Sequence, residues 1–378
     1  MKLVIAPDSF KGSLSAVEVA EVMKRAISKA LPQAEAVLVP AADGGEGTMD
    51  SLVAATGGKK TAVTVQGPTC QPVKAEYGVL GDNETCVIEM ASASGLVLIP
   101  ADERNPMVTT TYGTGELIKA ALDAGYQSFI LAVGGSATND GGAGMLEALG
   151  MKLLDRDGEA VGFGGEELGR IASIDDSLFD KRIAQSTFMI ASDVQNPFVG
   201  PTGASAVFGP QKGATPEMVA TLDRHLTKWA DLIEEKTTIR LHDRAGAGAA
   251  GGIGGAFQAF FPSSMKRGID LVIEYTGLEQ KLEGADLVLT GEGQIDYQTA
   301  SGKTPMGVAE AANKQGIPVI AIAGSVGQGI EELYQYGMTS VFSIVKGPME
   351  LQQAIEHCEE YVAFTTEQVV RTFFASRN

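Results

Sequence analysis

Cysteine and histidine are scarce in this chain, and their scarcity limits the chemistry that it can perform. Three cysteines and three histidines are scattered over 378 residues. Cys70, Cys86 and Cys358 form neither a disulfide framework nor a zinc-binding spacing, which is typical of proteins of a reducing compartment. The histidines are equally dispersed and give little support to a histidine metal site or a serine–histidine dyad.

Positive charge is also in deficit. The 29 lysine and arginine residues stand against 47 aspartate and glutamate residues, so the net charge is −18. Such a field repels nucleic acid and anionic membranes, which are bound through clustered basic residues. No apolar run approaches the ~18 residues of a membrane-spanning helix, and the N-terminus lacks the apolar core of a signal peptide. We therefore expect a cytoplasmic protein, monomeric or homodimeric, that acts on a small molecule.

Glycine, in contrast, is abundant: 47 of 378 residues, nearly twice the usual share of ~7%. The densest cluster, residues 134–144, lies between an apolar run at 129–133 and a helical pattern at 145–149. A strand, a polar glycine loop and a helix start together form an anion site, because backbone N–H groups and the helix dipole both favour negative charge. We therefore predict that this loop binds phosphate through Gly134, Gly135, Ser136, Thr138, Asn139 and Asp140.

Both ends of the chain carry patterns of strands alternating with helices. At the N-terminal end, residues 3–6 form a short apolar run, and Ser15 with Glu18 forms a capping box that begins a helix. From residue 286 onward the alternation returns, with a strand at 287–289 and a helix that Thr304 is expected to cap. A long final helix is predicted over 351–374. This order predicts a parallel sheet covered by helices.

The middle of the chain has a different pattern. Between residues 63 and 90, apolar residues alternate with period two and are separated by turn signals, which predicts an antiparallel meander. We therefore expect an α/β protein in which both chain ends, residues 1–64 and 285–378, join into one parallel sheet. Residues 65–284 are expected to form a second, inserted domain of mixed α/β type.

Acidic residues follow several of the predicted strands, among them Asp8, Asp43, Asp193 and Glu292. Each could simply cap the next helix. In a parallel sheet, however, such loops gather at the carboxyl edge, where crowded carboxylates repel one another unless Mg²⁺ or a lysine lies between them. Glycine loops, acids and isolated lysines without a catalytic histidine favour metal-dependent phosphoryl transfer, which needs positioning and charge neutralisation more than covalent chemistry.

Two matches to nucleotide-binding motifs are weak. Residues 246–251 satisfy the dinucleotide fingerprint, but the acid at the expected spacing, Asp270, begins an apolar run instead of ending one. Gly302-Lys303-Thr304 is similar to the end of a P-loop, but Tyr297 occupies the position of the first glycine. We therefore do not expect a Walker-type site.

Several longer motifs together resemble one known family. They are Ile5–Lys11, Ala42–Thr48, Gly113–Leu117, Gly134–Gly144, Asp193–Pro197, Phe208–Ala214, Gly246–Gly255 and Thr290–Gly293. The chain is similar to the bacterial glycerate kinases of the first structural class, which act in glucarate, galactarate and glyoxylate catabolism. The resemblance extends from residue 1 to about residue 375 and departs at Gln294, where many members have arginine.

The resemblance implies ATP-dependent phosphorylation of D-glycerate, at the 2-hydroxyl, to give 2-phosphoglycerate. It also implies a Rossmann-like domain built from the two chain ends, an inserted α/β domain and an active site in the cleft between them. Arg104, in a matching stretch, is expected to hold the glycerate carboxylate.

We assign hypothetical roles to the remaining candidates. Asp193 accepts or orients the hydroxyl proton, Lys11 neutralises the moving phosphoryl group, and Asp296 is a second candidate base. Metal ligands are expected at Asp43 and Glu46, and the substrate is expected at Asp8, Ser9, Arg104 and Glu292. Two other functions stay open: a non-catalytic sugar-acid sensor, and an NAD-dependent dehydrogenase that uses the glycines at 246–251.

Overall fold

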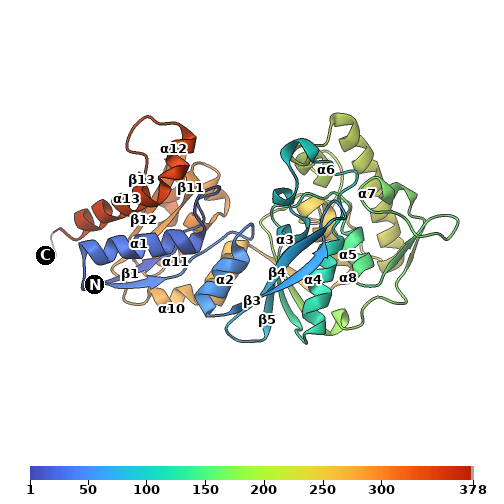
Figure 1. The fold of residues 1–378 in the computed structure, drawn as a ribbon, viewed down its shortest axis with the longest axis horizontal. Coiled ribbons are helices and arrows are strands. Elements are labelled where there is room, and N and C mark those ends of the chain that lie inside the picture. The colour runs from blue at the N-terminus through green and yellow to red at the C-terminus, as the bar shows by residue number, and fades with distance from the viewer. Residues whose placement is uncertain (376–378) are drawn as a thin grey trace. The chain divides into compact units, whose positions relative to one another are not determined.

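The computed structural model describes residues 1–375, which form two compact units (Figure 1). The first unit contains residues 1–43, 50–58 and those from 267 onward. The second unit contains residues 44–49 and 59–266. The boundaries expected from the sequence, after residues 64 and 284, lie further along the chain than these.

The first unit is built on a five-stranded parallel sheet with the order β13-β12-β11-β1-β2. Strands from the two ends of the chain therefore pair directly, with Leu3 opposite Leu287. This confirms the predicted fold class. The strands are β1 (Lys2–Ile5), β2 (Glu35–Leu38), β11 (Leu287–Ile295), β12 (Val319–Val326) and β13 (Met338–Ser343).

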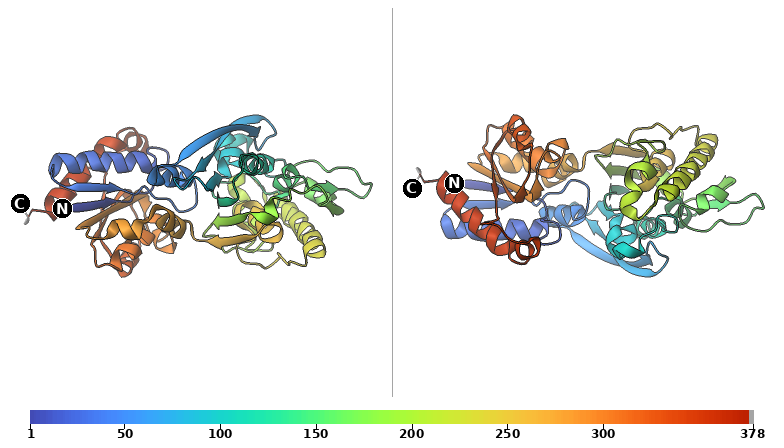
Figure 2. Two further views of the ribbon diagram at one scale, coloured as in Figure 1. Left: turned by 90° about the horizontal axis from the view of Figure 1, so that it is seen from below. Right: turned by 90° about the horizontal axis from the view of Figure 1, so that it is seen from above.

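Helices cover both faces of this sheet (Figure 2). On one face, α1 and α13 pack side by side and share a hydrophobic core with β1, β11 and β12. On the other, α11 packs against β11 and α9, because right-handed crossovers that run in opposite directions from the centre place their helices on opposite faces. The helices are α1 (Ala16–Ala30), α2 (Thr48–Thr56, which begins in the second unit), α9 (Gly268–Thr276), α10 (Leu278–Leu282), α11 (Thr304–Asn313), α12 (Leu351–Glu356) and α13 (Cys358–Phe373).

The second unit contains a six-stranded mixed sheet with the order β10-β9-β6-β5-β4-β3. β10, β9, β6 and β5 are parallel, whereas β3 and β4 complete the predicted antiparallel meander. Its strands are β3 (Lys59–Gln66), β4 (Pro72–Val79), β5 (Thr85–Glu89), β6 (Ser128–Ala132), β9 (Thr187–Ala191) and β10 (Ser263–Lys266), and β7 (Lys152–Leu154) pairs separately with β8 (Ser173–Asp175).

The helices of the second unit enclose a large apolar core around Trp229 and the stacked rings of Phe129 and Phe188. α4 packs on α5 and β3, while α6 packs on α7. The helices are α3 (Ala91–Ser94), α4 (Tyr112–Asp123), α5 (Ala143–Ala148), α6 (Ala204–Phe208), α7 (Pro216–Thr237) and α8 (Ile253–Phe260). Within residues 1–375, no helix is both long and apolar enough to cross a membrane.

Two local predictions differ from the structure. The cap of α11 is Lys303, not Thr304, and the Thr304 hydroxyl donates to Asp8 instead. The predicted final helix over 351–374 is divided in two at His357, where φ is −104° and ψ is 14°, outside helical geometry. In both cases a local rule gave way to tertiary structure.

The predicted capping box at the start of α1 is present and yields a stability test. The Ser15 hydroxyl accepts from the Glu18 backbone N–H at 3.3 Å, and the Ser15 N–H donates to the Glu18 carboxylate at 2.8 Å. We expect Ser15→Ala to lower the free energy of unfolding by about 1 kcal/mol, measured by urea denaturation. The matched control is Ser28→Ala, in the same helix, whose exposed hydroxyl only donates to the Lys24 carbonyl. Equal effects of the two variants would contradict the capping argument.

Candidate functional site

Three carboxylates gather in the first unit, and we call Asp8, Asp43 and Glu292 the acidic cluster. The chain after β1 continues along β11, since the Asp8 N–H donates to the Gly291 carbonyl at 2.8 Å. The segment after β2 runs beside the segment after β1, since the Ala41 N–H donates to the Pro7 carbonyl at 2.9 Å. Asp8 follows β1 and Glu292, expected after a strand, lies within β11, so both are at the switch point of the sheet, where open α/β sheets bind ligands; Asp43 follows the neighbouring strand β2.

Two members of the acidic cluster, Asp8 and Glu292, are buried, and the pKa of each is raised. Burial, reinforced by the negative charges of Asp43 and Glu292, raises the pKa of Asp8 to about 7. Burial also raises the pKa of Glu292, against the opposing effects of the Thr299 hydroxyl at 2.6 Å and the Lys303 ammonium at 3.5 Å. Perturbed carboxylates at the end of a parallel sheet are typical of functional sites.

The other candidates of the first unit lie around the same loops. Lys11 is exposed, and its backbone nitrogen lies beside Gly293. The Ser9 N–H donates to the Asp8 carboxylate at 2.6 Å. Asp296 accepts from the Gln298 backbone N–H and from the Gln294 side chain, both at 2.8 Å. Gln294, the residue that departs from the family pattern, therefore holds the second candidate base.

In the second unit, two glycine segments meet main chain to main chain. A Cβ atom on Gly134 would lie 2.7 Å from the Gly45 Cα, and one on Gly44 would lie 3.0 Å from the Ala191 carbonyl oxygen. The carboxyl ends of β6 and β9 therefore both adjoin the 44–49 segment. Half-buried Asp193 follows β9 at this edge. The structure places exposed Glu46 in this unit and Asp43, the other predicted metal ligand, in the first.

The helix start that was predicted to bind phosphate already holds an anion of the protein itself. The Asp140 carboxylate, 1% exposed, accepts from the backbone N–H groups of Gly142 and Gly144 at 3.1 and 3.4 Å. It also accepts from the backbone and the hydroxyl of Thr111, both at 2.8 Å. The helix dipole and the N–H donors do attract an anion here, as expected for a helix N-terminus. Because the Asp140 carboxylate occupies these donors, they are not available to a phosphate.

The rest of the glycine loop, residues 134–144, divides into an inner and an outer part. Thr138 and Asn139 are fully buried, and the Asn139 amide donates to the Ser205 hydroxyl at 2.9 Å. The Thr138 Oγ1 and the Asn139 Oδ1 have no hydrogen-bond partner within residues 1–375, so their predicted phosphate contacts stay a prediction. In the outer part, Gly134 is half-buried and Gly135 is exposed, whereas Ser136 is buried, with 5% of its surface exposed.

The glycines at 246–251 pack against the backbone of the glycine loop. A Cβ atom on Gly251 would lie 2.0 Å from the Thr138 carbonyl oxygen, and its φ of +73° also favours glycine. The Gly141 N–H donates to the Gly251 carbonyl at 3.0 Å. These glycines are needed for close packing of backbone on backbone, so the fingerprint match gives no support to the NAD alternative.

Sequence reasoning gave no role to Lys212, which is 1% exposed. Its ammonium donates to the Ser136 hydroxyl at 2.8 Å and to the Thr138 carbonyl at 2.6 Å. Burial lowers the pKa of Lys212 to about 7, although the charge of Asp140 opposes this. Gly213 then packs against the Arg104 backbone, where a Cβ atom would lie 2.2 Å from the carbonyl oxygen. The signal in the sequence that could have pointed to Lys212 was the motif Phe208–Ala214, which contains it.

Among residues 1–375, no three histidine, cysteine, aspartate or glutamate side chains are grouped as a complete metal site. Mg²⁺ in phosphoryl-transfer sites, however, usually takes one or two carboxylates, with substrate phosphates and water completing its shell. In the acidic cluster the charge of Asp43 raises the pKa of both Asp8 and Glu292, so a cation bound there would relieve repulsion. The donor set therefore fits Mg²⁺ that arrives with a nucleotide.

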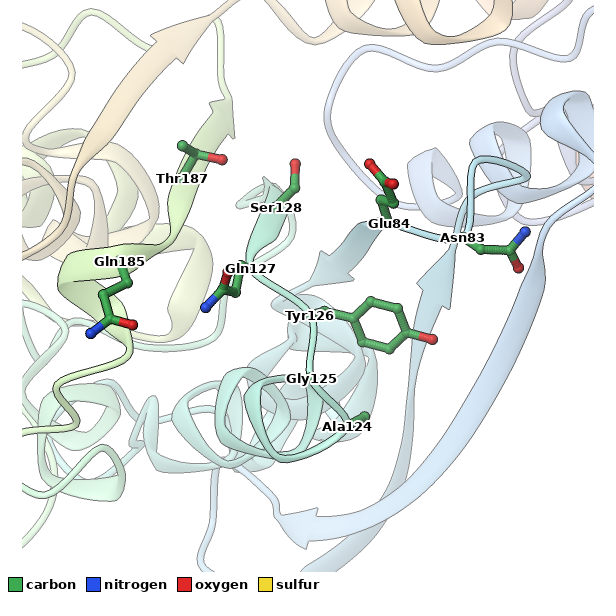
Figure 3. A pocket seen from close by; sticks show the side chains of 9 residues that line it. All are labelled: Asn83, Glu84, Ala124, Gly125, Tyr126, Gln127, Ser128, Gln185 and Thr187. Carbon is green, nitrogen blue, oxygen red and sulfur yellow. The ribbon is translucent and has the colours of Figure 1, made fainter.

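A pocket of about 620 Å³ lies elsewhere in the second unit, at the amino ends of β5, β6 and β9 (Figure 3). Its lining is mostly exposed and contains none of the predicted site residues. It occupies the opposite edge of the sheet from Gly134 and Asp193. The residues around it are Asn83, Glu84, Ala124, Gly125, Tyr126, Gln127, Ser128, Gln185 and Thr187.

The perturbed pKa of Asp8 predicts a pH dependence of stability. Its pKa in the folded protein, about 7, exceeds the ordinary 3.8. Between these two pH values the folded protein keeps a proton on Asp8 that the unfolded chain has lost. This contribution to stability is complete below pH 3.8 and is lost as the pH rises to about 7. In Asp8→Asn the decline in unfolding temperature over this range should be shallower than in the wild type. The control Asp157→Asn changes an exposed residue, and identical profiles for all three proteins would refute the buried-proton argument.

Comparison with known proteins agrees with this architecture. The model of the glycerate kinase family matches residues 3–374. A Bacillus subtilis protein named glycerate kinase is 51% identical over 98% of this chain and 97% of its own length, and an Escherichia coli protein named glycerate 2-kinase is 45% identical over 98% of both.

A crystal structure of a protein assigned as glycerate kinase 2 from Salmonella typhimurium LT2 has a TM-score of 0.89 to this chain. The two chains are 48% identical, and the match covers 100% of this chain and 99% of the other. The resemblance noted in the sequence is thereby confirmed over the whole chain: the protein belongs to the glycerate kinase family.

Proposed function

We propose that this protein transfers the γ-phosphoryl group of ATP to the 2-hydroxyl of D-glycerate, giving 2-phosphoglycerate and ADP. The observation that carries the proposal is the full-length similarity to proteins named glycerate kinase, of which the Escherichia coli relative is named for position 2. The hydroxyl oxygen forms a bond to the γ-phosphorus, the bond to the bridging oxygen of ADP breaks, and the hydroxyl proton passes to a carboxylate.

Asp193 is the carboxylate that we favour as the acceptor of this proton. It follows β9 at the edge where the glycine segments 44–49 and 134–136 meet, so backbone N–H groups lie near it. Asp296 is the weaker candidate, because both of its carboxylate oxygens already accept hydrogen bonds. Lys11 neutralises charge on the moving phosphoryl group, and Arg104 binds the glycerate carboxylate.

The remaining candidates supply binding contacts. Asp8, Ser9 and Glu292 form hydrogen bonds with glycerate, and burial raises the pKa of both carboxyl groups. Gly134, Gly135 and Ser136 supply phosphate contacts from the outer part of the glycine loop. Asp43 and Glu46 are the proposed Mg²⁺ ligands. When bound, Mg²⁺ neutralises charge on the transferring phosphates.

Incubation of the protein with ATP, Mg²⁺ and D-glycerate tests the reaction. We expect ADP and a single new phosphate monoester, which ³¹P NMR against authentic standards identifies as 2-phosphoglycerate. Formation of 3-phosphoglycerate would correct the position of transfer. Binding of glycerate without consumption of ATP would instead favour the sensor alternative.

Two variants test the assigned roles. We expect Asp193→Asn and Lys11→Met each to lower kcat by at least a hundredfold, because phosphoryl transfer depends on positioned charges. Their far-UV circular dichroism and unfolding temperature should match those of the wild type. Asp157→Asn and Lys24→Met alter exposed residues of the same types and should keep full activity. Full activity of Asp193→Asn would remove that residue from the mechanism.

A further inference from the structure

Lys212 is the buried cation of the second unit for which neither the sequence motifs nor the proposed reaction gives a role. A lysine that is 1% exposed is unusual, because burial of an ammonium group without a carboxylate partner is costly. Its two hydrogen-bond partners, the Ser136 hydroxyl and the Thr138 carbonyl, are both neutral. The protein therefore holds a cation directly behind the glycine loop.

The hydrogen bond to Ser136 determines what that hydroxyl can do. A serine hydroxyl has one hydrogen to donate, and here its oxygen already accepts from the Lys212 ammonium. The hydroxyl hydrogen is therefore directed to another acceptor. Ser136 itself is held from both sides, by the bond from the Leu96 N–H to the Gly135 carbonyl and by that from the Ala137 N–H to the Ser94 carbonyl, both 2.9 Å.

Several buried polar atoms near Lys212 have no hydrogen-bond partner within residues 1–375. They are the Arg104 Nε, the Thr138 Oγ1 and the Asn139 Oδ1. Such atoms are rare in native proteins, and each calls for a bound water or ligand as an explanation. Arg104 is more than 100 residues before Lys212 in the sequence, yet its backbone lies against Gly213, the residue after Lys212. Two basic side chains thus come from adjoining segments of a chain whose net charge is −18.

From this geometry we propose that Lys212 is a positioning residue that fixes the Ser136 hydroxyl as a donor to a phosphoryl oxygen and supplies a compensating positive charge behind it. This rests on the proposed function and names the phosphoryl group, rather than a carboxylate alone, as the chemistry recognised there. The phosphoryl group can belong to the nucleotide or to the phosphorylated product. A hydroxyl that donates while it accepts from an ammonium group is a stronger donor than an isolated one.

The charges around Lys212 give this role a measurable signature. Asp140 faces it from the glycine loop and Arg104 belongs to the adjoining segment. Burial lowers the pKa of Lys212 to about 7, and a phosphoryl dianion beside Ser136 would raise that pKa again by favouring the ammonium form. Binding of the dianion is therefore coupled to uptake of a proton by the Lys212 amine.

Calorimetric titration in two buffers of different ionisation enthalpy measures that proton. ADP, 2-phosphoglycerate and D-glycerate are titrated at pH 8 into the wild type, Lys212→Met, Ser136→Ala and the control Lys228→Met. Lys228 is a half-buried lysine of the same unit that donates to the Gly169 carbonyl at 2.7 Å. We expect Lys212→Met and Ser136→Ala to weaken binding of at least one phosphate ligand by roughly ten- to a hundredfold and to abolish the extra proton uptake.

Each outcome decides one question. A loss confined to ADP assigns the nucleotide to this loop, a loss confined to 2-phosphoglycerate assigns the product, and a loss for both assigns a shared phosphoryl position. Unchanged affinity and proton uptake in Ser136→Ala overturn the proposal, even if Lys212→Met fails to fold. A loss for D-glycerate alone also overturns it, in favour of carboxylate binding. A wild type that binds phosphate ligands in this way but does not phosphorylate glycerate would refute the proposed reaction and leave this inference standing.

Discussion

The second unit depends on the hydrogen bonds that one buried carboxylate, that of Asp140, accepts from its surroundings. Thr111, Gly142 and Gly144 all donate to it, so the carboxylate joins the start of α4 to the start of α5. None of these groups has water to replace a lost partner, and each would be costly if left alone. The charge of Asp140 also favours the ammonium form of Lys212, which holds the outer part of the same loop. Asp140 therefore orders the loop segments that we propose to bind phosphate.

The first unit reaches a comparable result through topology. β1 and β11 lie next to each other and lead into crossovers that run in opposite directions, the topology at which open α/β sheets bind ligands. Asp8 lies beside Glu292 of β11 because the backbone after β1 continues to pair with β11, through the bond from the Asp8 N–H to the Gly291 carbonyl. Burial and mutual repulsion of the two carboxylates cost free energy. Hydrogen bonds from Thr304 and Thr299 and the ion pair with Lys303 offset that cost. Burial thus raises the pKa of both carboxyl groups, and a bound cation would lower it by favouring the charged form.

Much of this could be read from the sequence, and the failures have a common cause. Periodicity in residues 3–6, 63–90 and 287–289 reflects burial on one or two faces of a sheet, so it predicted the strands, and the Ser15–Glu18 box predicted a helix start. The roles of Asp140 and Lys212 could not be read in this way, because their partners lie far away in the chain, at Thr111 and at Ser136. A carboxylate beside glycines looks the same in sequence whether it caps its own helix or faces a ligand. The family resemblance identified the motif that contains Lys212, but it did not predict the hydrogen bond from Lys212 to Ser136.

The pairing of β1 with β11 has a consequence for how the chain is made. During translation β1 emerges first, with the apolar face of α1 close behind, yet its neighbour in the sheet is synthesised only after the whole second unit. Until then β1 offers an unpaired edge on that side, a feature prone to aggregation in incomplete chains. The second unit needs only residues up to 266 and so can mature on the ribosome while the first waits for its C-terminal half. Vectorial synthesis therefore imposes an order of assembly opposite to the order in which the two units begin.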